Sequence, residues 1–345
     1  MFFKWLRQLF IDGWFVMRKV SKLGERKVIK IIRSCLDMMP ETPVPFGDDV
    51  SAVKLNQTTL AIIKTDMLVG KTDIPSGMSL RQAARKAIVM NVSDFAAKGV
   101  SPVAVMVSLG LPRSYDEEDV RQIGLGLNDG AREYGAYVVG GDTGEASDLV
   151  ISCSLFGFCK SQTLVKRSTA RPGDMVAVTG EFGKSAAGLK ILLEKLEVPD
   201  KIRKPLTEAV LMPRARLKEG IALAETGVVT ASIDSSDGLA WSLRELSVAS
   251  NVGFTIDNVP VASEAAEFAQ TFNLNPWELG LYGGEEYELV VTVKPEFWNK
   301  AEKAVEKLGS CLIKIGEVTE KIRLELKIDG KTLPIEPRGW EHFKS

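Results

Sequence analysis

The apolar residues of the chain recur with two different spacings, which predict a protein of mixed helices and strands. Apolar side chains three and four positions apart indicate helices, whereas short apolar runs bounded by turn residues indicate strands. The predicted helices are residues 18–39, 79–99, 117–134, 185–196, 239–249 and 297–308. The predicted strands are residues 50–55, 60–65, 103–109, 136–140, 149–157, 175–179, 230–233, 287–293, 313–318 and 324–328.

The first two predicted strands are joined by a short polar turn, which indicates a β-hairpin. If Leu55 pairs with Leu60, Asp49 lies opposite Asp66 at the open end of the hairpin. Like charges that face each other across two strands are destabilising, so this pairing favours a bound cation. A slip of one residue would instead separate the two carboxylates and leave both in water.

A turn signal near the middle of the chain, Arg171-Pro172-Gly173-Asp174, divides it into two comparable halves. A length of 345 residues suits about two domains, and an apolar content of 45% is enough for a core in each. We therefore predict a two-domain α+β or α/β protein. Its N-terminal domain is expected at residues 18–160 and its C-terminal α/β domain at residues 161–345, after an extension at residues 1–17.

The predicted extension is rich in aromatic residues and allows several interpretations. It can be an amphipathic helix at a membrane surface, a degenerate signal sequence, or a segment upstream of a start at Met17. Asp12 and Gly13 interrupt the apolar stretch and disfavour a signal sequence. We favour a helix packed on a domain or subunit surface, or a disordered extension.

The charge balance and the histidine content narrow the chemistry. Lys and Arg number 44 against 45 Asp and Glu, so no basic excess favours nucleic acid as a partner. The single histidine, His342, excludes histidine-rich zinc sites and leaves any catalytic triad dependent on the C-terminal tail. We therefore expect an enzyme of this composition to work through carboxylates, backbone amides and metal ions.

The four cysteines form no Cys-x-x-Cys pair and are too few for a disulfide framework in so long a chain. We expect them to be reduced, which predicts a cytoplasmic location. No apolar run reaches the length of about 18 residues that a transmembrane helix requires, so we expect no transmembrane segment.

Further aspartates occur where predicted helices and strands end. Asp94 lies near the end of the helix at 79–99, and Asp142 follows the strand at 136–140 after two glycines. Together with the hairpin carboxylates they predict a site for a hard cation such as Mg²⁺. Asp234 and Asp237 lie between a strand and a helix, where an aspartate pair can hold Mg²⁺ against a bound phosphate.

One glycine-containing turn imitates a phosphate-binding loop. Residues 179–185 read TGEFGKS after a strand and before a helix, but the first glycine of a Walker A loop would fall at Val178. We interpret this segment as a tight strand-to-helix turn. The glycine pattern of a dinucleotide-binding fold does not follow any predicted strand either.

Several motifs, in this order along the chain, resemble those of the thiamine-monophosphate kinase family. They are Gly47-Asp48-Asp49, Lys64-Thr65-Asp66, Asn91-Val92-Ser93-Asp94-Phe95-Ala96-Ala97-Lys98-Gly99, Gly140-Gly141-Asp142-Thr143, Lys166-Arg167-Ser168, Arg171-Pro172-Gly173-Asp174, Asp234-Ser235-Ser236-Asp237-Gly238, Gly283-Gly284-Glu285-Glu286-Tyr287-Glu288 and Gly339-Trp340-Glu341-His342-Phe343. The resemblance extends from about residue 20 to the end of the chain. It also places the chain in the superfamily of aminoimidazole ribonucleotide synthetase.

The resemblance implies a fold and an activity. The N-terminal sheet is expected to form a barrel with that of a second subunit across a homodimer, and the C-terminal α/β domain to close over ATP. The family transfers the γ-phosphoryl group of ATP to thiamine monophosphate with several Mg²⁺ ions, which gives thiamine diphosphate. The alternatives are another ATP-dependent enzyme of the superfamily acting on a purine-type intermediate, or a non-catalytic partner protein that binds nucleotide or metal.

The resemblance also implies roles for individual residues. The metal ligands would be Asp49, Thr65, Asp66, Asp94, Asp142, Asp234 and Asp237. The nucleotide contacts would be Gly141, Asp142, Arg167 and Ser236, and the thiamine end would meet Asp73, Glu285 and Trp340. Arg167, Asp66 and Asp142 would be the catalytic residues, with Arg167 stabilising the transferring phosphoryl charge. Bacterial members commonly carry His at the position of Asp73, so this contact departs from the family pattern.

Overall fold

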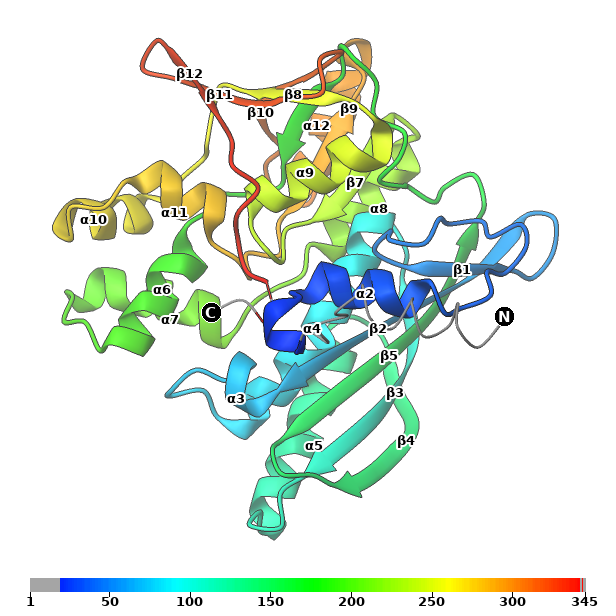
Figure 1. The fold of residues 1–345 in the computed structure, drawn as a ribbon, viewed down its shortest axis with the longest axis vertical. Coiled ribbons are helices and arrows are strands. Elements are labelled where there is room, and N and C mark those ends of the chain that lie inside the picture. Colours follow the sequence, from blue (N-terminus) through cyan, green and yellow to red (C-terminus); the bar gives the residue numbers. More distant parts are fainter. Residues whose placement is uncertain (1–18, 342, 344–345) are drawn as a thin grey trace, which may run out of the picture. The chain divides into compact units, whose positions relative to one another are not determined.

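The computed structural model describes residues 19–341 and 343, which fall into two units (Figure 1). The terminal unit consists of the described residues up to Pro40 together with 340–341 and 343, and the main unit runs from Glu41 to Gly339. The predicted extension at residues 1–17 and His342 lie outside the described residues.

The terminal unit contains a short 3₁₀ helix, η1 (Val20–Lys22), and helix α2 (Glu25–Arg33). The helix predicted for this segment is therefore present, but it ends at Arg33 rather than at Pro40. Beyond that point the Ser34 hydroxyl donates to the Ile31 carbonyl at 2.7 Å. Such side-chain bonds to the backbone compete with helix continuation.

The first sheet of the main unit has five strands in the order β1-β2-β5-β3-β4. They are β1 (Ser51–Lys54), β2 (Thr59–Val69), β3 (Pro102–Leu111), β4 (Tyr137–Glu145) and β5 (Val150–Lys160). Helices α4 (Leu80–Lys98) and α5 (Glu117–Glu133) pack together on one face of this sheet, and the short α3 (Gly70–Asp73) follows β2 (Figure 1). Less and more exposed positions alternate along β5 and along β2 from Ile62 onward, so the helices cover one face of the sheet there.

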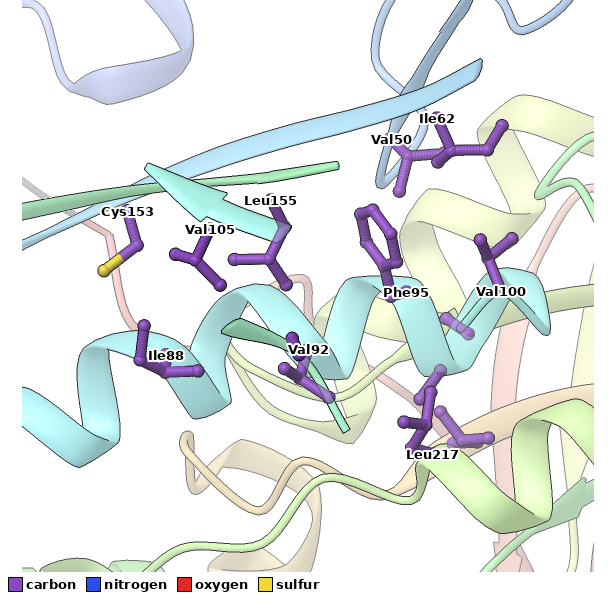
Figure 2. Close-up of a cluster of buried hydrophobic side chains, with 14 of the residues drawn as sticks. Val50, Ile62, Ile88, Val92, Phe95, Val100, Val105, Cys153, Leu155 and Leu217 are labelled. Atoms are coloured by element: carbon purple, nitrogen blue, oxygen red, sulfur yellow. The ribbon is translucent and has the colours of Figure 1, made fainter. Parts of the chain in front are cut away.

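Helix α4 is the central element of the main unit. Its start is fixed by a reciprocal capping box between Ser79 and Gln82, and its end by Gly99, which adopts a left-handed conformation with φ of 66°. The predicted limits of 79 and 99 are thus confirmed. Figure 2 shows Ile88, Val92 and Phe95 of this helix among apolar side chains of the sheet and of the neighbouring helices.

The second sheet has seven strands in the order β12-β11-β8-β10-β6-β9-β7. They are β6 (Met175–Val178), β7 (Val229–Asp234), β8 (Gly253–Ile256), β9 (Leu289–Val293), β10 (Ile313–Thr319), β11 (Leu324–Ile328) and β12 (Lys331–Pro334). The helices around it are α6 (Lys184–Glu194), α7 (Asp200–Leu211), α8 (Leu217–Thr226), α9 (Leu239–Ser250), α10 (Ser263–Thr271), α11 (Pro276–Tyr282), η2 (Pro295–Phe297) and α12 (Trp298–Glu306). Its pairs are antiparallel except for β11 with β8.

One hydrophobic core joins the two sheets. It runs from the first sheet through α4 and α8 to Val291 and Val293 of β9, while a second cluster fills the other face of the second sheet. Because α4 lies within this shared core, it is buried on nearly all sides, unlike a surface helix. The structure confirms an α/β protein with two sheets, both of them open in the described part of this single chain. The predicted domain boundary at residue 160 stays a prediction.

The register predicted for the hairpin is wrong by one residue. Lys54, not Leu55, pairs with Leu60, because the amides of Leu55 and Asn56 already bond to the Thr59 carbonyl in the turn. The Asn56 side chain closes this turn by accepting from the amides of residues 58 and 59. As a result, Asp49 does not lie opposite Asp66 in the ladder.

Other differences concern the extent of elements. The strand predicted at 136–140 continues to Glu145, so Asp142 lies inside β4 instead of following a strand. Helices α7, α8, α10 and α11 were outside the prediction, and α7 contains Pro205, which ordinarily signals a helix end. No helix in the described part of the chain is long and apolar enough to cross a membrane.

We predict that Gly99→Ala destabilises the protein by about 2–4 kcal/mol. A Cβ atom at this position would meet the Ala224 Cβ of α8 at 2.1 Å, and the left-handed backbone adds strain. The matched control is Gly124→Ala in α5, where no atom lies within 4 Å of the new methyl group. This change should stabilise by about 0.5–1 kcal/mol. Urea unfolding of both variants checks the prediction, and equal effects would contradict it.

Candidate functional site

Three buried carboxylates from distant parts of the chain converge near the end of α4. Asp49 precedes β1, Asp94 lies in the last turns of α4, and Asp234 ends β7. One oxygen from each lies within 4.8 Å of the others, and the three residues are 3%, 6% and 4% exposed. We call them the acidic cluster. The arrangement depends on the shared core, because that core holds α4 between the two sheets.

Burial and mutual repulsion act together on two of these carboxyl groups. Burial, reinforced by the charge of Asp49, raises the pKa of Asp234 to about 7, even though Asp234 accepts a hydrogen bond from the Ser93 hydroxyl at 2.8 Å. Burial also raises the pKa of Asp94 well above its ordinary value; the charge of Lys64 opposes this rise, and the charges of the neighbouring carboxylates add to it. Both groups therefore favour a proton or a cation at neutral pH.

Asp49 is instead held ionised by two cations. Burial alone would raise its pKa, but the charges of Arg167 and Lys98 outweigh burial and lower it. The Lys98 ammonium lies 2.6 Å from Asp49 and 2.7 Å from Asp48, and it donates to the Ser232 carbonyl at 2.8 Å. Arg167 donates to the other oxygen of Asp49 through Nε at 2.8 Å and through Nη2.

A third cation, Lys64, connects the cluster to the first sheet. Its ammonium lies 2.9 Å from Asp94 and 3.2 Å from Asp66. These contacts form because alternate residues of β2 face α4, and both Lys64 and Asp66 are on that face. Burial would lower the pKa of Lys64, but the charges of Asp94 and Asp66 outweigh burial and raise it, so Lys64 stays protonated.

The donor set suits a divalent cation. Six carboxylates, of residues 48, 49, 66, 94, 234 and 245, surround the three cations Lys64, Lys98 and Arg167, which leaves a surplus of three negative charges when all are ionised. Carboxylate oxygens are the ligands that Mg²⁺ prefers, and one oxygen from each of three buried carboxylates lies within 4.8 Å of the others. The residues present therefore fit the metal that the motifs imply.

Two of the predicted metal ligands, Thr65 and Asp142, lie outside the acidic cluster. Thr65 is on the exposed face of β2, where its hydroxyl donates to the Cys153 carbonyl at 3.1 Å and accepts from Ser154. Asp142 is in β4, where it pairs with Ser108 of β3, and β4 is three strands away from β2 in the sheet. At about 4.8 Å per strand, this places Asp142 about 14 Å from β2 within one chain.

The remaining nucleotide candidates divide between the two sheets. The nucleotide candidate Ser236 and the metal candidate Asp237 follow β7 after Ser235, close in sequence to Asp234. Gly141 is next to Asp142 in β4, and a Cβ atom there would meet the Val107 carbonyl oxygen of β3 at 1.8 Å. Close packing of β4 on β3 is therefore sufficient reason for this glycine.

The substrate candidates Asp73 and Glu285 are joined by a lysine that sequence reasoning did not single out. The Lys86 ammonium of α4 lies 2.5 Å from the Glu285 carboxylate and 3.0 Å from the Asp73 carbonyl oxygen. The Asp73 carboxylate itself accepts from the Val69 amide at 2.7 Å. Trp340 belongs to the terminal unit, so its contact with the substrate stays a prediction.

The turn that imitates a phosphate loop already has an anion at its amides. The Glu286 carboxylate accepts from the amides of Gly183 and Ser185, at 2.6 and 3.2 Å, at the start of α6. Burial raises the pKa of Glu286 to about 7. This arrangement supports the interpretation of residues 179–185 as a structural turn.

The residues to which the sequence analysis gave no role are the lysines that hold the carboxylates. Lys86 and Lys98 are 1% and 0% exposed, although lysine is rarely buried without a partner. One signal was available, since Asp94 and Lys98 are four residues apart on a helix and thus share a face. For Lys64 the signal was partial, since Asp66 is two positions away on the same face of a strand whereas its second partner, Asp94, is 30 residues away in sequence.

Comparison with known proteins points to the same family as the sequence motifs. The AIR synthase related protein family models match the chain with the N-terminal domain at residues 47–159 and the C-terminal domain at residues 171–329. The thiamine-monophosphate kinase of Nitrosopumilus maritimus is 36% identical over 325 residues, which are 94% of this chain and 100% of that protein. The enzyme of the same name from Pyrococcus horikoshii is 38% identical over 330 residues, 94% of this chain and 98% of that one.

A solved structure is similar over most of the fold. The structure of AaThiL complexed with AMPPCP and TMP has a TM-score of 0.83 and 31% sequence identity, and the match covers 95% of this chain and 99% of that chain. The similarity includes both sheets, since it leaves only a small part of this chain uncovered.

We predict a pH-dependent stability difference between the wild type and Asp234→Asn in the absence of divalent cations. Because the pKa of Asp234 is raised to about 7, the folded protein binds a proton that the unfolded chain releases above its ordinary pKa of 3.8. The contribution of Asp234 to the stability of the wild type therefore falls as the pH rises from 4 to 7. The variant lacks this loss, so its stability relative to the wild type should increase by about 2–4 kcal/mol between pH 4 and pH 8. Urea unfolding in EDTA measures it, and a constant difference over this range would contradict it.

Proposed function

The chain belongs to the thiamine-monophosphate kinase family, and from this membership we propose that its acidic cluster holds Mg²⁺ for the transfer of the γ-phosphoryl group of ATP to thiamine monophosphate. The enzyme is a phosphotransferase with a phosphate group as acceptor. The observation that carries the metal assignment is the convergence of three buried carboxylates within 4.8 Å. The proposed ligands are Asp49, Asp66, Asp94, Asp234 and Asp237, with Thr65 and Asp142 considered below.

The chemistry requires positioning more than proton removal. The second pKa of a phosphate monoester is about 6, so the acceptor is already an anion near neutral pH. When bound, Mg²⁺ supplies charge neutralisation for the phosphates of ATP and of the acceptor. The residues of the chain orient both phosphates and keep the developing charge close to fixed cations.

Arg167 is our candidate for the residue that stabilises the transferring phosphoryl group. Its guanidinium reaches the acidic cluster and pairs with Asp49, which keeps it next to the proposed metal ligands. A planar guanidinium can donate two parallel hydrogen bonds to phosphate oxygens. Together with Gly141, Asp142 and Ser236, it forms our proposed set of nucleotide contacts.

The thiamine end of the substrate carries a cationic ring, and the residues proposed to receive it are Asp73, Glu285 and Trp340. Lys86 connects Asp73 and Glu285, so the two predicted contacts are fixed relative to each other through α4. An aromatic ring such as that of Trp340 can attract a cationic ring through its face. In this proposal Lys86 orients Glu285 and does not contact the reacting phosphates.

We also propose that the chain forms a homodimer through the exposed face of its first sheet. This face carries large apolar side chains that no element of the main unit covers: Ile63, Met67, Val103, Met106, Phe156 and Phe158. Contiguous apolar surface of this kind ordinarily marks an interface. Facing sheets from two copies, joined at their edges, would form the barrel that the family resemblance implies.

The dimer would also give Asp142 and Thr65 a role. Strand β4 is an edge strand, and β1 pairs with β2 only up to Ile63 among the described residues. The segment of β2 that carries Lys64, Thr65 and Asp66 therefore has an edge available for a strand of another copy. In this proposal β4 of one copy lies beside that segment in the partner, which brings Asp142 to the neighbouring site. The cytoplasmic location predicted from the thiols stays a prediction.

We expect the purified protein to convert ATP and thiamine monophosphate into ADP and thiamine diphosphate, and Asp94→Asn to lose about 100-fold or more of this activity. The change keeps the shape of the side chain but removes one charge of the acidic cluster. Asp129→Asn is the matched control and should retain activity. Asp129 lies on α5 and forms an exposed ion pair with Arg81 of α4. Identification of the thiamine product by mass spectrometry decides the function, and ADP release without thiamine diphosphate would refute it.

We predict that Asp66→Asn and Asp142→Asn are each inactive but complement one another when mixed. If a site takes Asp66 from one copy and Asp142 from the other, one of the two sites in a mixed dimer carries both native residues. Random reassortment should then restore about a quarter of wild-type activity. Co-refolding or co-expression of the two variants followed by the kinase assay measures this. If both residues came from the same chain, mixing would restore nothing.

A further inference from the structure

We propose that the Lys64 ammonium is a permanent cation of the acidic cluster that takes the place of one divalent ion, so the site binds one fewer such ion than its carboxylates could hold. This inference rests on the proposed metal site and names a residue to which neither the motifs nor the comparisons give a role. Lys64 is a positioning residue in this proposal, since its contacts are with carboxylates.

The contacts of Lys64 differ from those of the other buried lysines. Lys98 and Lys86 each donate to a backbone carbonyl as well as to carboxylates, so each also holds the chain in place. In the described part of the chain, the ion pairs of Lys64 lead only to Asp94 at 2.9 Å and Asp66 at 3.2 Å. Both partners are proposed metal ligands, so the ammonium lies between two carboxylates that a divalent ion could otherwise bridge.

The ion pair between Lys64 and Asp94 is mostly shielded from solvent, so water screens the charge of Lys64 only weakly. The Lys64 side chain is 19% exposed and that of Asp94 is 8% exposed. Charges at this depth interact strongly, and a buried charge left without a partner is costly. A long side chain fixed on a strand of the sheet provides this compensation whether or not metal is present.

Charge balance sets the expected consequence. With Lys64, the six carboxylates and three cations of the site leave a surplus of three negative charges, of which one divalent ion neutralises two. Without Lys64 the surplus becomes four, and Asp66 and Asp94 lose the cation between them. These two carboxylates would then be free to share an additional ion.

The test is a count of Mn²⁺ ions bound by the nucleotide-free full chain, measured by electron paramagnetic resonance of free Mn²⁺. Lys64→Met keeps the length of the side chain and removes its charge, and it should bind one more Mn²⁺ per chain than the wild type. Lys64→Arg retains the charge and should match the wild type. Lys54→Met, on neighbouring β1 at a side chain that is 57% exposed, is the surface control and should also match.

A second comparison keeps the inference testable if Lys64→Met does not fold. Asp66→Asn lowers the negative surplus by one, and the double variant Lys64→Met/Asp66→Asn restores the surplus of the wild type. The double variant should therefore bind Mn²⁺ about tenfold or more tightly than Asp66→Asn alone. Thermal unfolding with and without Mn²⁺ gives the same order, because an ion bound to the native state raises its stability.

The outcomes separate this inference from the proposed function. If the wild type binds Mn²⁺ and Lys64→Met binds the same number with the same affinity, the role of Lys64 is refuted while the metal site stands. If the wild type binds none and Lys64→Met binds one, Lys64 is the substitute cation that we propose. If neither protein binds Mn²⁺, the metal site and the inference fail together.

Discussion

The compensation of buried negative charge is the constraint on which the rest of this structure depends. Asp49 and its neighbour Asp48 are buried, and a carboxylate at that depth persists in its charged form only beside a cation. Lys98 and Arg167 supply that charge from α4 and from the segment that follows the first sheet. These ion pairs therefore join three segments of the chain at one point, which is also where the proposed chemistry takes place.

The shared hydrophobic core makes this junction rigid. Helix α4 contributes Ile88, Val92 and Phe95 to a core that extends into both sheets (Figure 2). The same helix presents Asp94, Lys86 and Lys98 from its buried surface. A helix that is packed on all sides cannot shift without disturbing both sheets, so the charged groups it carries keep fixed positions. Stability and function are thus built on one element.

The sequence predicted which residues form the candidate site better than it predicted how those residues are arranged. The limits of α4 were predictable, since the capping residues Ser79 and Gly99 act on the backbone within one turn. The register of the first hairpin was not, because the Asn56 side chain closes the turn one residue earlier than the apolar pattern indicates. Asp142 was expected at the end of a strand, whereas pairing with β3 extends β4 beyond it.

The sequence by itself determined which residues could carry the function, because oxygen-rich motifs and the scarcity of histidine restrict the chemistry to carboxylates, cations and phosphate. Only the tertiary structure decided how those groups are paired. Ser93 meets Asp234, and Arg167 meets Asp49, across more than a hundred residues of chain. Periodicity and capping describe interactions within a few residues, whereas these pairings are set by how α4 packs between the two sheets.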